Sequence, residues 1–270
     1  MAVFDVTDLS ALEILDSRGR PTLAVTVRLG DGTTASARVP SGASTGSREA
    51  VERRDGDPAR YEGKGVLGAV AAVNTEIAGL LRGRPWASLA EADQAVIDLD
   101  GTGNKSRLGA NATVGTSMAL ARALAASAGV PLWQWLTPDS VTPSLPVPHF
   151  NVLNGGVHAP NSLDFQEFMI APVGAPSMAE AVRAGAEVYA ALRRELAGRK
   201  LSTGLGDEGG FAPEITEPEE VLHLLVPAIT DAGYAPGRDG CRSRWTQRRR
   251  SSASPTGGTG WPGSCCQAVT

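Results

Sequence analysis

The chain has 270 residues, of which 42% are hydrophobic and 20% are charged, and its formal net charge is −4. This length and apolar content allow one large or two ordinary domains with buried cores, and they exclude a disordered, fibrous or disulfide-rich chain. The composition is uneven along the chain. Residues 241–270 contain five arginines, all three cysteines and no acidic residue, so they carry +5 while residues 1–240 carry −9.

The acidic body and the lack of long apolar stretches restrict the cellular setting. The first ten residues have no basic segment leading into an apolar stretch, so no cleaved signal peptide is predicted. No window approaches the roughly 18 apolar residues of a membrane span, and residues 1–240 contain no cysteine that would need an oxidising compartment. A charge of −9 argues against nucleic acid as the main partner. The sequence predicts a cytoplasmic protein without a membrane span.

The first domain, residues 1–136, has predicted strands first and helices after them. Residues 22–29 alternate between apolar and polar side chains, which predicts a half-buried strand, and a Gly-Asp-Gly turn leads into a returning strand over 33–39. Helical spacing or capping patterns predict three helices next: 65–81, a short helix opened by the capping box of Ser88 and Glu91, and 110–128. This order is typical of an α+β domain.

Four prolines lie in residues 137–148, which we interpret as a linker. The second domain, residues 149–239, starts with two buried strands, predicted over 147–153 and 165–173, and continues with two helices. Each helix is opened by a hydroxyl residue with a glutamate three positions later: Ser177 with Glu180, and Thr216 with Glu219. The second domain therefore begins strand, strand, helix, helix.

Residues 40–46, Pro-Ser-Gly-Ala-Ser-Thr-Gly, follow a predicted strand end. Small hydroxyl residues between glycines leave backbone N–H groups open to a phosphate or a metal-bound ligand. An ordinary flexible turn accounts for the same composition equally well.

Two further loops carry candidate chemistry. His158 follows a glycine pair, and a lone histidine there is more often a loop hydrogen-bonder than a catalyst. Glu167 lies on a mostly apolar strand, where a charge is costly unless it is paired, and strand alternation predicts that Gln166 points to the opposite face. The adjacent acids Asp207 and Glu208 lie between glycines on both sides. Two close carboxylates raise one pKa and favour a general acid or a cation site, although a solvated acidic turn is the alternative.

Six long segments resemble the enolase family, bacterial type. They occur in the family's order between residues 3 and 239: 13–22, 39–46, 99–111, 150–158, 164–170 and 206–213. Two small departures lie outside the family's catalytic positions, since Arg20 stands where asparagine is usual and Pro160 where aspartate or glycine is common. The resemblance implies an α+β N-terminal domain followed by the start (ββαα) of an enolase-type α/β barrel, which is truncated in this chain.

The resemblance also implies an activity, the reversible dehydration of 2-phosphoglycerate to phosphoenolpyruvate in glycolysis by a Mg²⁺-dependent hydro-lyase. Glu208 matches the family's general acid, and Glu167 matches a second carboxylate near the departing hydroxyl. His158 and Gln166 match substrate contacts, and Ser44 matches a serine that binds Mg²⁺ when its loop closes. A homo-oligomer, at least a dimer, is expected, in the cytoplasm, although family members also occur at the cell surface.

The family's acidic Mg²⁺ ligands, its lysine base and its phosphate-binding arginine all fall beyond residue 239 and have no counterpart here. Read one base out of register through GC-rich codons, residues 244–252 can encode Ala-Met-Asp-Pro-Ala-Ala-Ser-Glu-Phe. Its last seven residues, from the aspartate onward, resemble the family's expected next strand, including its first metal aspartate. We therefore interpret residues 240–270 as a frameshifted, disordered tail outside the family. The nucleotide sequence tests this hypothesis, because an alternate frame without a barrel continuation contradicts it.

Three interpretations of the whole chain follow. The first is an enolase-family lyase that is inactive alone, because the base and the main metal ligands are missing. The second is a catalytically dead fragment that acts only as a binding or dimerisation module through its first domain. The third is a nucleic-acid binder that uses the basic tail, which the acidic body disfavours.

Overall fold

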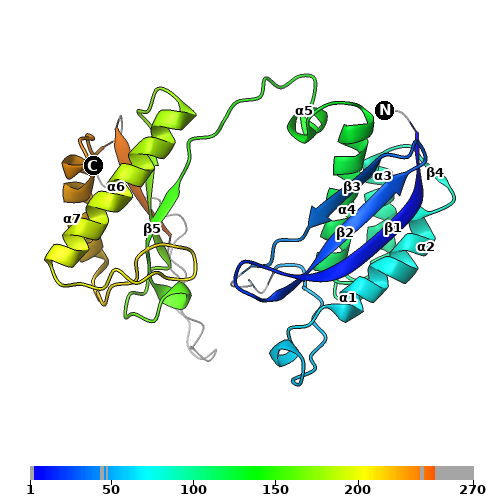
Figure 1. The fold of residues 1–270 in the computed structure, drawn as a ribbon, viewed down its shortest axis with the longest axis horizontal. Coiled ribbons are helices and arrows are strands. Elements are labelled where there is room, and N and C mark those ends of the chain that lie inside the picture. Colours follow the sequence, from blue (N-terminus) through cyan, green and yellow to red (C-terminus); the bar gives the residue numbers. More distant parts are fainter. Residues whose placement is uncertain (1–2, 43–45, 47, 238–239, 247–270) are drawn as a thin grey trace. The chain divides into compact units, whose positions relative to one another are not determined.

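The computed structural model describes residues 3–42, 46, 48–237 and 240–246. The chain divides into two compact units, Met1–Pro143 and Ser144–Thr270, coloured blue to green and green to orange in Figure 1. The division falls within the proline-rich segment 137–148. Each unit has its own hydrophobic core.

The first unit contains a four-stranded antiparallel sheet in the order β3-β2-β1-β4. Its strands are β1 (Phe4–Leu15), β2 (Pro21–Leu29), β3 (Thr34–Arg38) and β4 (Pro85–Trp86). The predicted hairpin is confirmed as β2 and β3. Strand β1 was not predicted, because a register shift between Val6 and Asp8 changes which alternate residues face the core.

Helices cover one face of this sheet (Figure 1). They are α1 (Leu67–Ala72), the π-helical η2 (Val73–Ile77), α2 (Ala78–Leu81), α3 (Leu89–Asp100) and α4 (Ala110–Ser127). The unit also contains the 3-10 helix η1 (Tyr61–Gly63) in the loop before α1, and α5 (Leu132–Leu136), which packs on α4. The predicted helix 65–81 is confirmed as the continuous run α1-η2-α2. From η2, the Asn74 side chain exchanges two hydrogen bonds with the backbone of Ala11 on β1. This amide satisfies backbone groups that have no neighbouring strand at that position.

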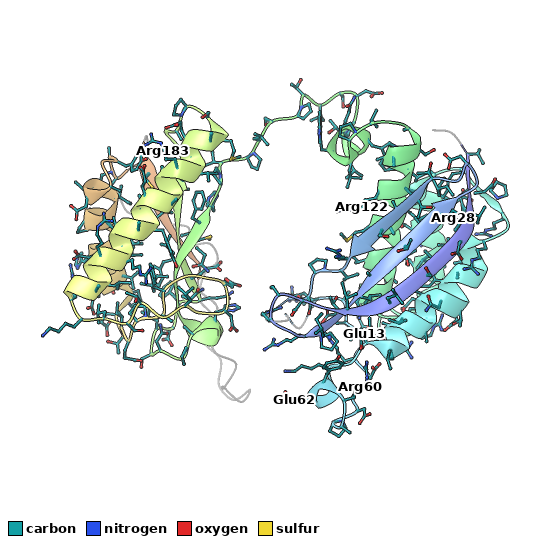
Figure 2. The ribbon with its side chains drawn as sticks, in the orientation of Figure 1. Glu13, Arg28, Arg60, Glu62, Arg122 and Arg183 are labelled. Atoms are coloured by element: carbon teal, nitrogen blue, oxygen red, sulfur yellow. The ribbon has the colours of Figure 1, made fainter. Side chains whose placement is uncertain are left out.

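An ion pair joins the end of β1 to the loop before α1. Glu13 accepts hydrogen bonds from Arg60 Nη1 and from the backbone N–H of Val66, each at 2.9 Å, and Figure 2 labels the pair. The Arg60 guanidinium is the main cause of a lowered pKa at Glu13, against the opposing effect of burial.

The second unit contains a three-stranded antiparallel sheet in the order β5-β6-β7, with two helices packed against it. Its elements are β5 (Phe150–Asn154), the 3-10 helix η3 (Gly156–His158), β6 (Glu167–Pro172), α6 (Met178–Gly198), α7 (Pro218–Asp231) and β7 (Cys241–Thr246). Val152, Phe168 and Ile170 are buried against Val188 and Leu192 of α6. The predicted order strand, strand, helix, helix is confirmed.

The predicted helix caps have mixed outcomes. Ser88 and Ser177 accept hydrogen bonds from the backbone N–H groups of Glu91 and Glu180, so both predicted caps are confirmed. The third prediction is wrong: α7 starts after Glu217, without a side-chain cap from Thr216. Pro218 occupies the first helical position, where its fixed φ suits the first turn and its missing N–H needs no partner.

Residues 241–246 form β7, so the prediction of disorder from residue 240 onward is wrong for these six residues. They pair antiparallel with β6 from Pro172↔Cys241 to Glu167↔Thr246. Backbone hydrogen bonds of this kind require an extended chain and no particular side chains, so composition alone does not exclude the strand. The remaining tail residues, 247–270, lie outside the described residues.

Within the part of the chain that the structure describes, no helix combines the length and apolar character needed to cross a bilayer.

Candidate functional site

Four of the five residues singled out from the sequence lie together in the second unit. His158 ends η3, Gln166 immediately precedes β6, Glu167 opens β6, and Glu208 lies in the glycine-rich turn 206–210. The Nε2 atom of His158 is 2.6 Å from Nε2 of Gln166 and 3.5 Å from Oε1 of Glu208. Glu208 also shares a side-chain hydrogen bond with Glu167. The cluster therefore joins two carboxyls, an imidazole and an amide.

Gln166 and Glu167 were predicted to point to opposite faces of one strand, but Gln166 lies outside the strand that forms. Gln166 contacts His158, and Glu167 contacts Glu208, which itself lies beside His158. Strand β6 begins only at Glu167, so the alternation of a regular strand does not extend back to Gln166.

A β-bulge in β5 aims two asparagines at the turn that carries Glu208. The pairing of β5 with β6 shifts register between Asn151 and Leu153, which adds one residue on the β5 side. Asn151 and Asn154, three positions apart, would face opposite sides of a regular strand. With the bulge, Asn151 Nδ2 donates to Glu208 Oε2 at 3.0 Å, and Asn154 Oδ1 accepts from the N–H of Gly210 at 2.9 Å.

The turn lies so close to β5 that two of its residues have no room for a side chain. A Cβ atom on Gly206 would lie 2.8 Å from Asn154 Cβ on β5 and 2.7 Å from the carbonyl oxygen of His158. One on Gly210 would lie 2.6 Å from Asn154 Oδ1 and 2.8 Å from Asn151 Oδ1. The glycines therefore permit the close backbone approach that places Glu208 over the strand.

Helix α6 holds the same turn from another side. The ring of Tyr189 stacks on Phe211, with 4.4 Å between ring centroids and 10° between ring planes. Its hydroxyl donates to the carbonyl oxygen of Gly209 at 2.8 Å. The backbone N–H of Asp207 donates to the carbonyl oxygen of His158 at 3.0 Å. Contacts from β5, η3 and α6 thus fix the backbone on both sides of Glu208.

The surroundings of Glu208 raise its pKa above the ordinary glutamate value. Partial burial is the largest cause, and the hydrogen bond and negative charge of Glu167 act in the same direction. His158 and the Asn151 amide oppose the shift, because both stabilise the ionised carboxylate. The Glu208 side chain keeps 34% of its surface exposed, whereas the His158 side chain keeps 2%. Glu208 is therefore a solvent-accessible acid beside a buried imidazole, and it holds its proton to a higher pH than an ordinary glutamate.

Family models match most of the chain. Residues 6–136 match the model described as the N-terminal domain of enolase, and residues 142–239 match the model described as its C-terminal TIM barrel domain. The chain belongs to the enolase family. The expected fold, an α+β domain followed by the start of an enolase-type barrel, is confirmed.

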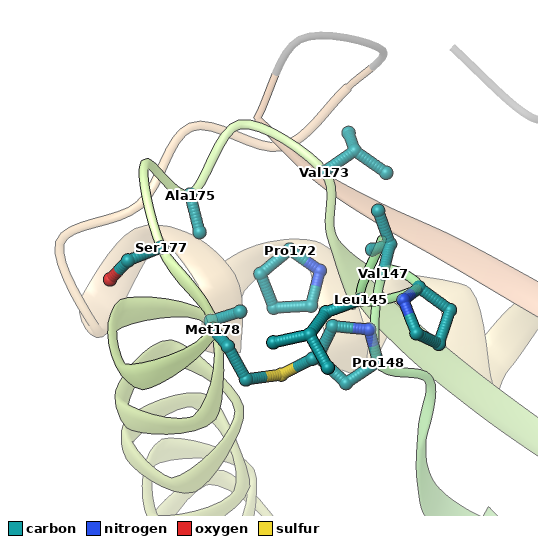
Figure 3. A pocket seen from close by; sticks show the side chains of 10 residues that line it. Leu145, Val147, Pro148, Pro172, Val173, Ala175, Ser177 and Met178 are labelled. Carbon is teal, nitrogen blue, oxygen red and sulfur yellow. The ribbon is translucent and has the colours of Figure 1, made fainter. Parts of the chain in front are cut away.

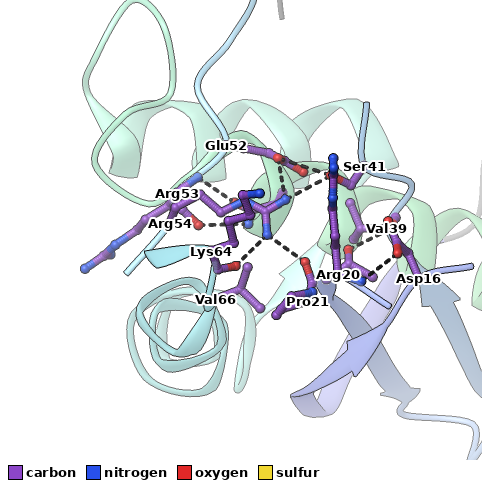
Figure 4. Close-up of polar contacts among 12 residues, drawn as sticks. Asp16, Arg20, Pro21, Val39, Ser41, Glu52, Arg53, Arg54, Lys64 and Val66 are labelled. Atoms are coloured by element: carbon purple, nitrogen blue, oxygen red, sulfur yellow. Dashed lines mark hydrogen bonds and ion pairs between the residues drawn. The ribbon is translucent and has the colours of Figure 1, made fainter. Parts of the chain in front are cut away.

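The loop that matches the enolase serine loop lies in the first unit, and its beginning is well held. Arg54 donates to Ser41 Oγ at 2.9 Å, to Glu52 at 2.7 Å and to the carbonyl oxygens of Pro21 and Lys64 (Figure 4). Ser44, the predicted Mg²⁺ contact, lies outside the described residues.

Magnesium, which the enolase family implies, is not matched by a set of ligands in the described part of the chain. Among residues 3–42, 46, 48–237 and 240–246, no three His, Cys, Asp or Glu side chains form a group that could hold a metal ion. The acid cluster of Glu208 and Glu167 therefore does not fit a metal centre of its own.

An apolar pocket of about 210 Å³ lies at the N-terminal end of α6 (Figure 3). Its walls include Leu145, Val147, Pro172 and Met178, and none of its lining side chains titrates. Acid–base chemistry needs a proton donor or acceptor, so this pocket is not a second candidate for the enolase-type site.

Asn151, Asn154 and Tyr189 were not singled out from the sequence, although they hold the turn that carries Glu208. The available signal was a pair of asparagines in the otherwise apolar segment 150–154. Buried amides in a strand need hydrogen-bond partners, and the polar turn at 206–210 is where those partners lie.

Proposed function

We propose that this chain carries the acid side of the reversible dehydration of 2-phosphoglycerate to phosphoenolpyruvate. Loss of water from this substrate breaks the bond between carbon and the hydroxyl oxygen, and hydroxide is a poor leaving group without a proton donor. Glu208 donates that proton, so that water leaves. Glu167 lies near the departing hydroxyl, and His158 and Gln166 contact the substrate.

The observation that carries the proposal is the environment of Glu208. Its pKa is raised by partial burial and by Glu167, so a larger fraction of the carboxyl is protonated near neutral pH than for an exposed glutamate. The carboxyl is still accessible to a ligand, because 34% of the side chain is exposed. An acid that is both protonated and accessible is what the departing hydroxyl requires.

The reaction also needs a base, which removes the proton from the carbon beside the substrate carboxylate, and Mg²⁺, which would stabilise the negative charge left on the substrate. The described residues offer no group of metal ligands. We therefore propose that the 270-residue chain, by itself, does not turn over substrate. We further propose a cytoplasmic homo-oligomer, as in the family.

An alternative is that the chain acts only as a binding or dimerisation module through its first unit. Leu12 of β1 is 71% exposed, so an apolar residue of this sheet is open to a partner.

Binding and turnover of 2-phosphoglycerate separate the two proposals. Nuclear magnetic resonance of the 270-residue chain is expected to show side-chain shifts of His158 and Gln166 when 2-phosphoglycerate is added. The shifts of Gln166 should be lost in His158→Ala and kept in His223→Ala, because His223 is an exposed residue of α7 and is not a member of the cluster. If 2-phosphoglycerate causes no shifts at the cluster, the substrate site is refuted and the module is favoured.

A coupled assay for phosphoenolpyruvate, with 2-phosphoglycerate and Mg²⁺, tests the statement about turnover. We expect no product above the rate of a sample without protein. Turnover that disappears in Glu208→Gln would show that the chain is active alone, and would contradict that statement while supporting the role of Glu208.

A further inference from the structure

We propose that Asn151 is a positioning residue for Glu208, which fixes the direction of its carboxyl group relative to His158. This inference rests on the proposed function, because it takes Glu208 to be the proton donor. It adds Asn151, which does not contact the substrate bonds that are broken or formed and acts only through the Glu208 carboxyl.

The two oxygens of the Glu208 carboxyl face different groups. Oε2 accepts a hydrogen bond from Asn151 Nδ2 at 3.0 Å, and Oε1 lies 3.5 Å from His158 Nε2. A carboxyl group at the end of a long side chain otherwise rotates freely about its last bond. The amide of Asn151 therefore selects one rotation, in which Oε2 is held at the strand and Oε1 faces the imidazole.

The orientation of the Asn151 amide is itself constrained. Its Oδ1 atom is buried, and among the described residues it has no hydrogen-bond partner. Exchanging the two ends of the amide would break the bond from Nδ2 and, when Glu208 is ionised, would place Oδ1 against another acceptor. The bond from Nδ2 to Glu208 is consequently the one that keeps the amide in place.

Strand pairing and the neighbouring turn hold the backbone around Asn151 in place. Asn151 lies on β5 opposite Met169 of β6, directly before the bulge that also turns Asn154 toward Gly210. Gly210 has no side chain, and a Cβ atom there would lie 2.8 Å from Asn151 Oδ1. One strand thus holds both the backbone of the turn, through Asn154, and the carboxyl that the turn carries, through Asn151.

The charged groups around Glu208 act in known directions. Glu167 raises the Glu208 pKa, while His158 and the Asn151 amide lower it. Removing the amide should therefore shift the Glu208 titration to higher pH. Replacing it with a carboxylate should shift the titration further, because a third negative charge would lie beside the pair.

The experiment is a pH titration of the Glu208 side-chain carboxyl carbon by nuclear magnetic resonance in the full 270-residue chain. We expect the midpoint to rise in Asn151→Ala and to rise further in Asn151→Asp, which keeps the size of the side chain. Asn161→Ala is the matched control, because Asn161 is a buried asparagine of the same unit whose amide donates to the backbone of Asn154 and Pro213. Its Glu208 midpoint should equal that of the unchanged chain.

A second measurement needs no substitution. In the unchanged chain, the side-chain amide protons of Asn151 should shift with the same midpoint as the carboxyl of Glu208. The inference is overturned if these protons do not follow Glu208, or if Asn151→Ala and Asn161→Ala give the same midpoint. An ordinary glutamate midpoint in the unchanged chain is a different result, which would refute the proposed acid role itself.

Discussion

Replacing Gly210 with alanine should destabilise the second unit, because the turn that carries Glu208 lies against β5 without space for a methyl group. An alanine Cβ would lie 2.6 Å from Asn154 Oδ1, 2.8 Å from Asn151 Oδ1 and 2.9 Å from the backbone nitrogen of Leu153. These three distances are below van der Waals contact, so the turn must move away from the strand.

The size of the effect follows from two terms. Overpacking at a closely packed position costs about 1–3 kcal/mol. Movement of the turn also breaks the 2.9 Å hydrogen bond from the N–H of Gly210 to Asn154 Oδ1, and a buried acceptor left without its donor costs about 1–3 kcal/mol. Gly210→Ala should therefore lower the free energy of unfolding of the second unit by about 2–6 kcal/mol.

Hydrogen exchange of the backbone amides of β6, followed by mass spectrometry, measures this unit separately from the first. Gly209→Ala is the matched control, because Gly209 has φ +84° and a Cβ there would meet no atom within 4 Å. Gly209→Ala should lower the free energy of unfolding by about 1 kcal/mol, through backbone strain alone. The explanation by close approach is refuted if Gly210→Ala loses no more protection than Gly209→Ala.

Three further predictions concern other contacts. Ser177→Ala should lower the stability of the second unit by about 1 kcal/mol in chemical denaturation, because α6 loses its cap to the Glu180 N–H; unchanged stability contradicts this. Glu13→Gln should destabilise the first unit by about 1 kcal/mol near neutral pH, since Arg60 is 36% exposed and the pair is partly screened. Because the Glu13 pKa is lowered, the difference should vanish as the pH falls through that pKa, and a constant difference would contradict it. Glu208 contributes the opposite pH dependence of stability, because its pKa is raised. The free energy of unfolding of the second unit should fall as the pH rises from the ordinary glutamate pKa to the pKa of folded Glu208, and Glu208→Gln should remove this pH dependence.

Local patterns in the sequence predicted the parts of the fold that depend on neighbouring residues. The hairpin of β2 and β3 follows from alternation and a glycine turn, and the caps at Ser88 and Ser177 follow from a hydroxyl residue with a glutamate three positions later. Each of these features is decided within a few residues, so no tertiary information was needed.

Features decided by distant contacts could not be predicted in this way. The shift between Val6 and Asp8 conceals β1, and the bulge after Asn151 places two asparagines on one side of β5. Both depend on how a neighbouring strand is paired, which periodicity does not record. The resemblance identified His158, Gln166, Glu167 and Glu208, but it did not supply the amide and the tyrosine that hold their turn.

The central claim is that Glu208 is an acid whose proton is retained by burial and by Glu167. The most direct test is the titration of the Glu208 carboxyl carbon in the 270-residue chain, compared with Glu167→Gln and with the control Glu219→Gln on the exposed surface of α7. We expect a midpoint above that of an ordinary glutamate, which falls in Glu167→Gln and is unchanged in Glu219→Gln. An ordinary midpoint in the unchanged chain, or one that Glu167→Gln does not lower, would contradict it.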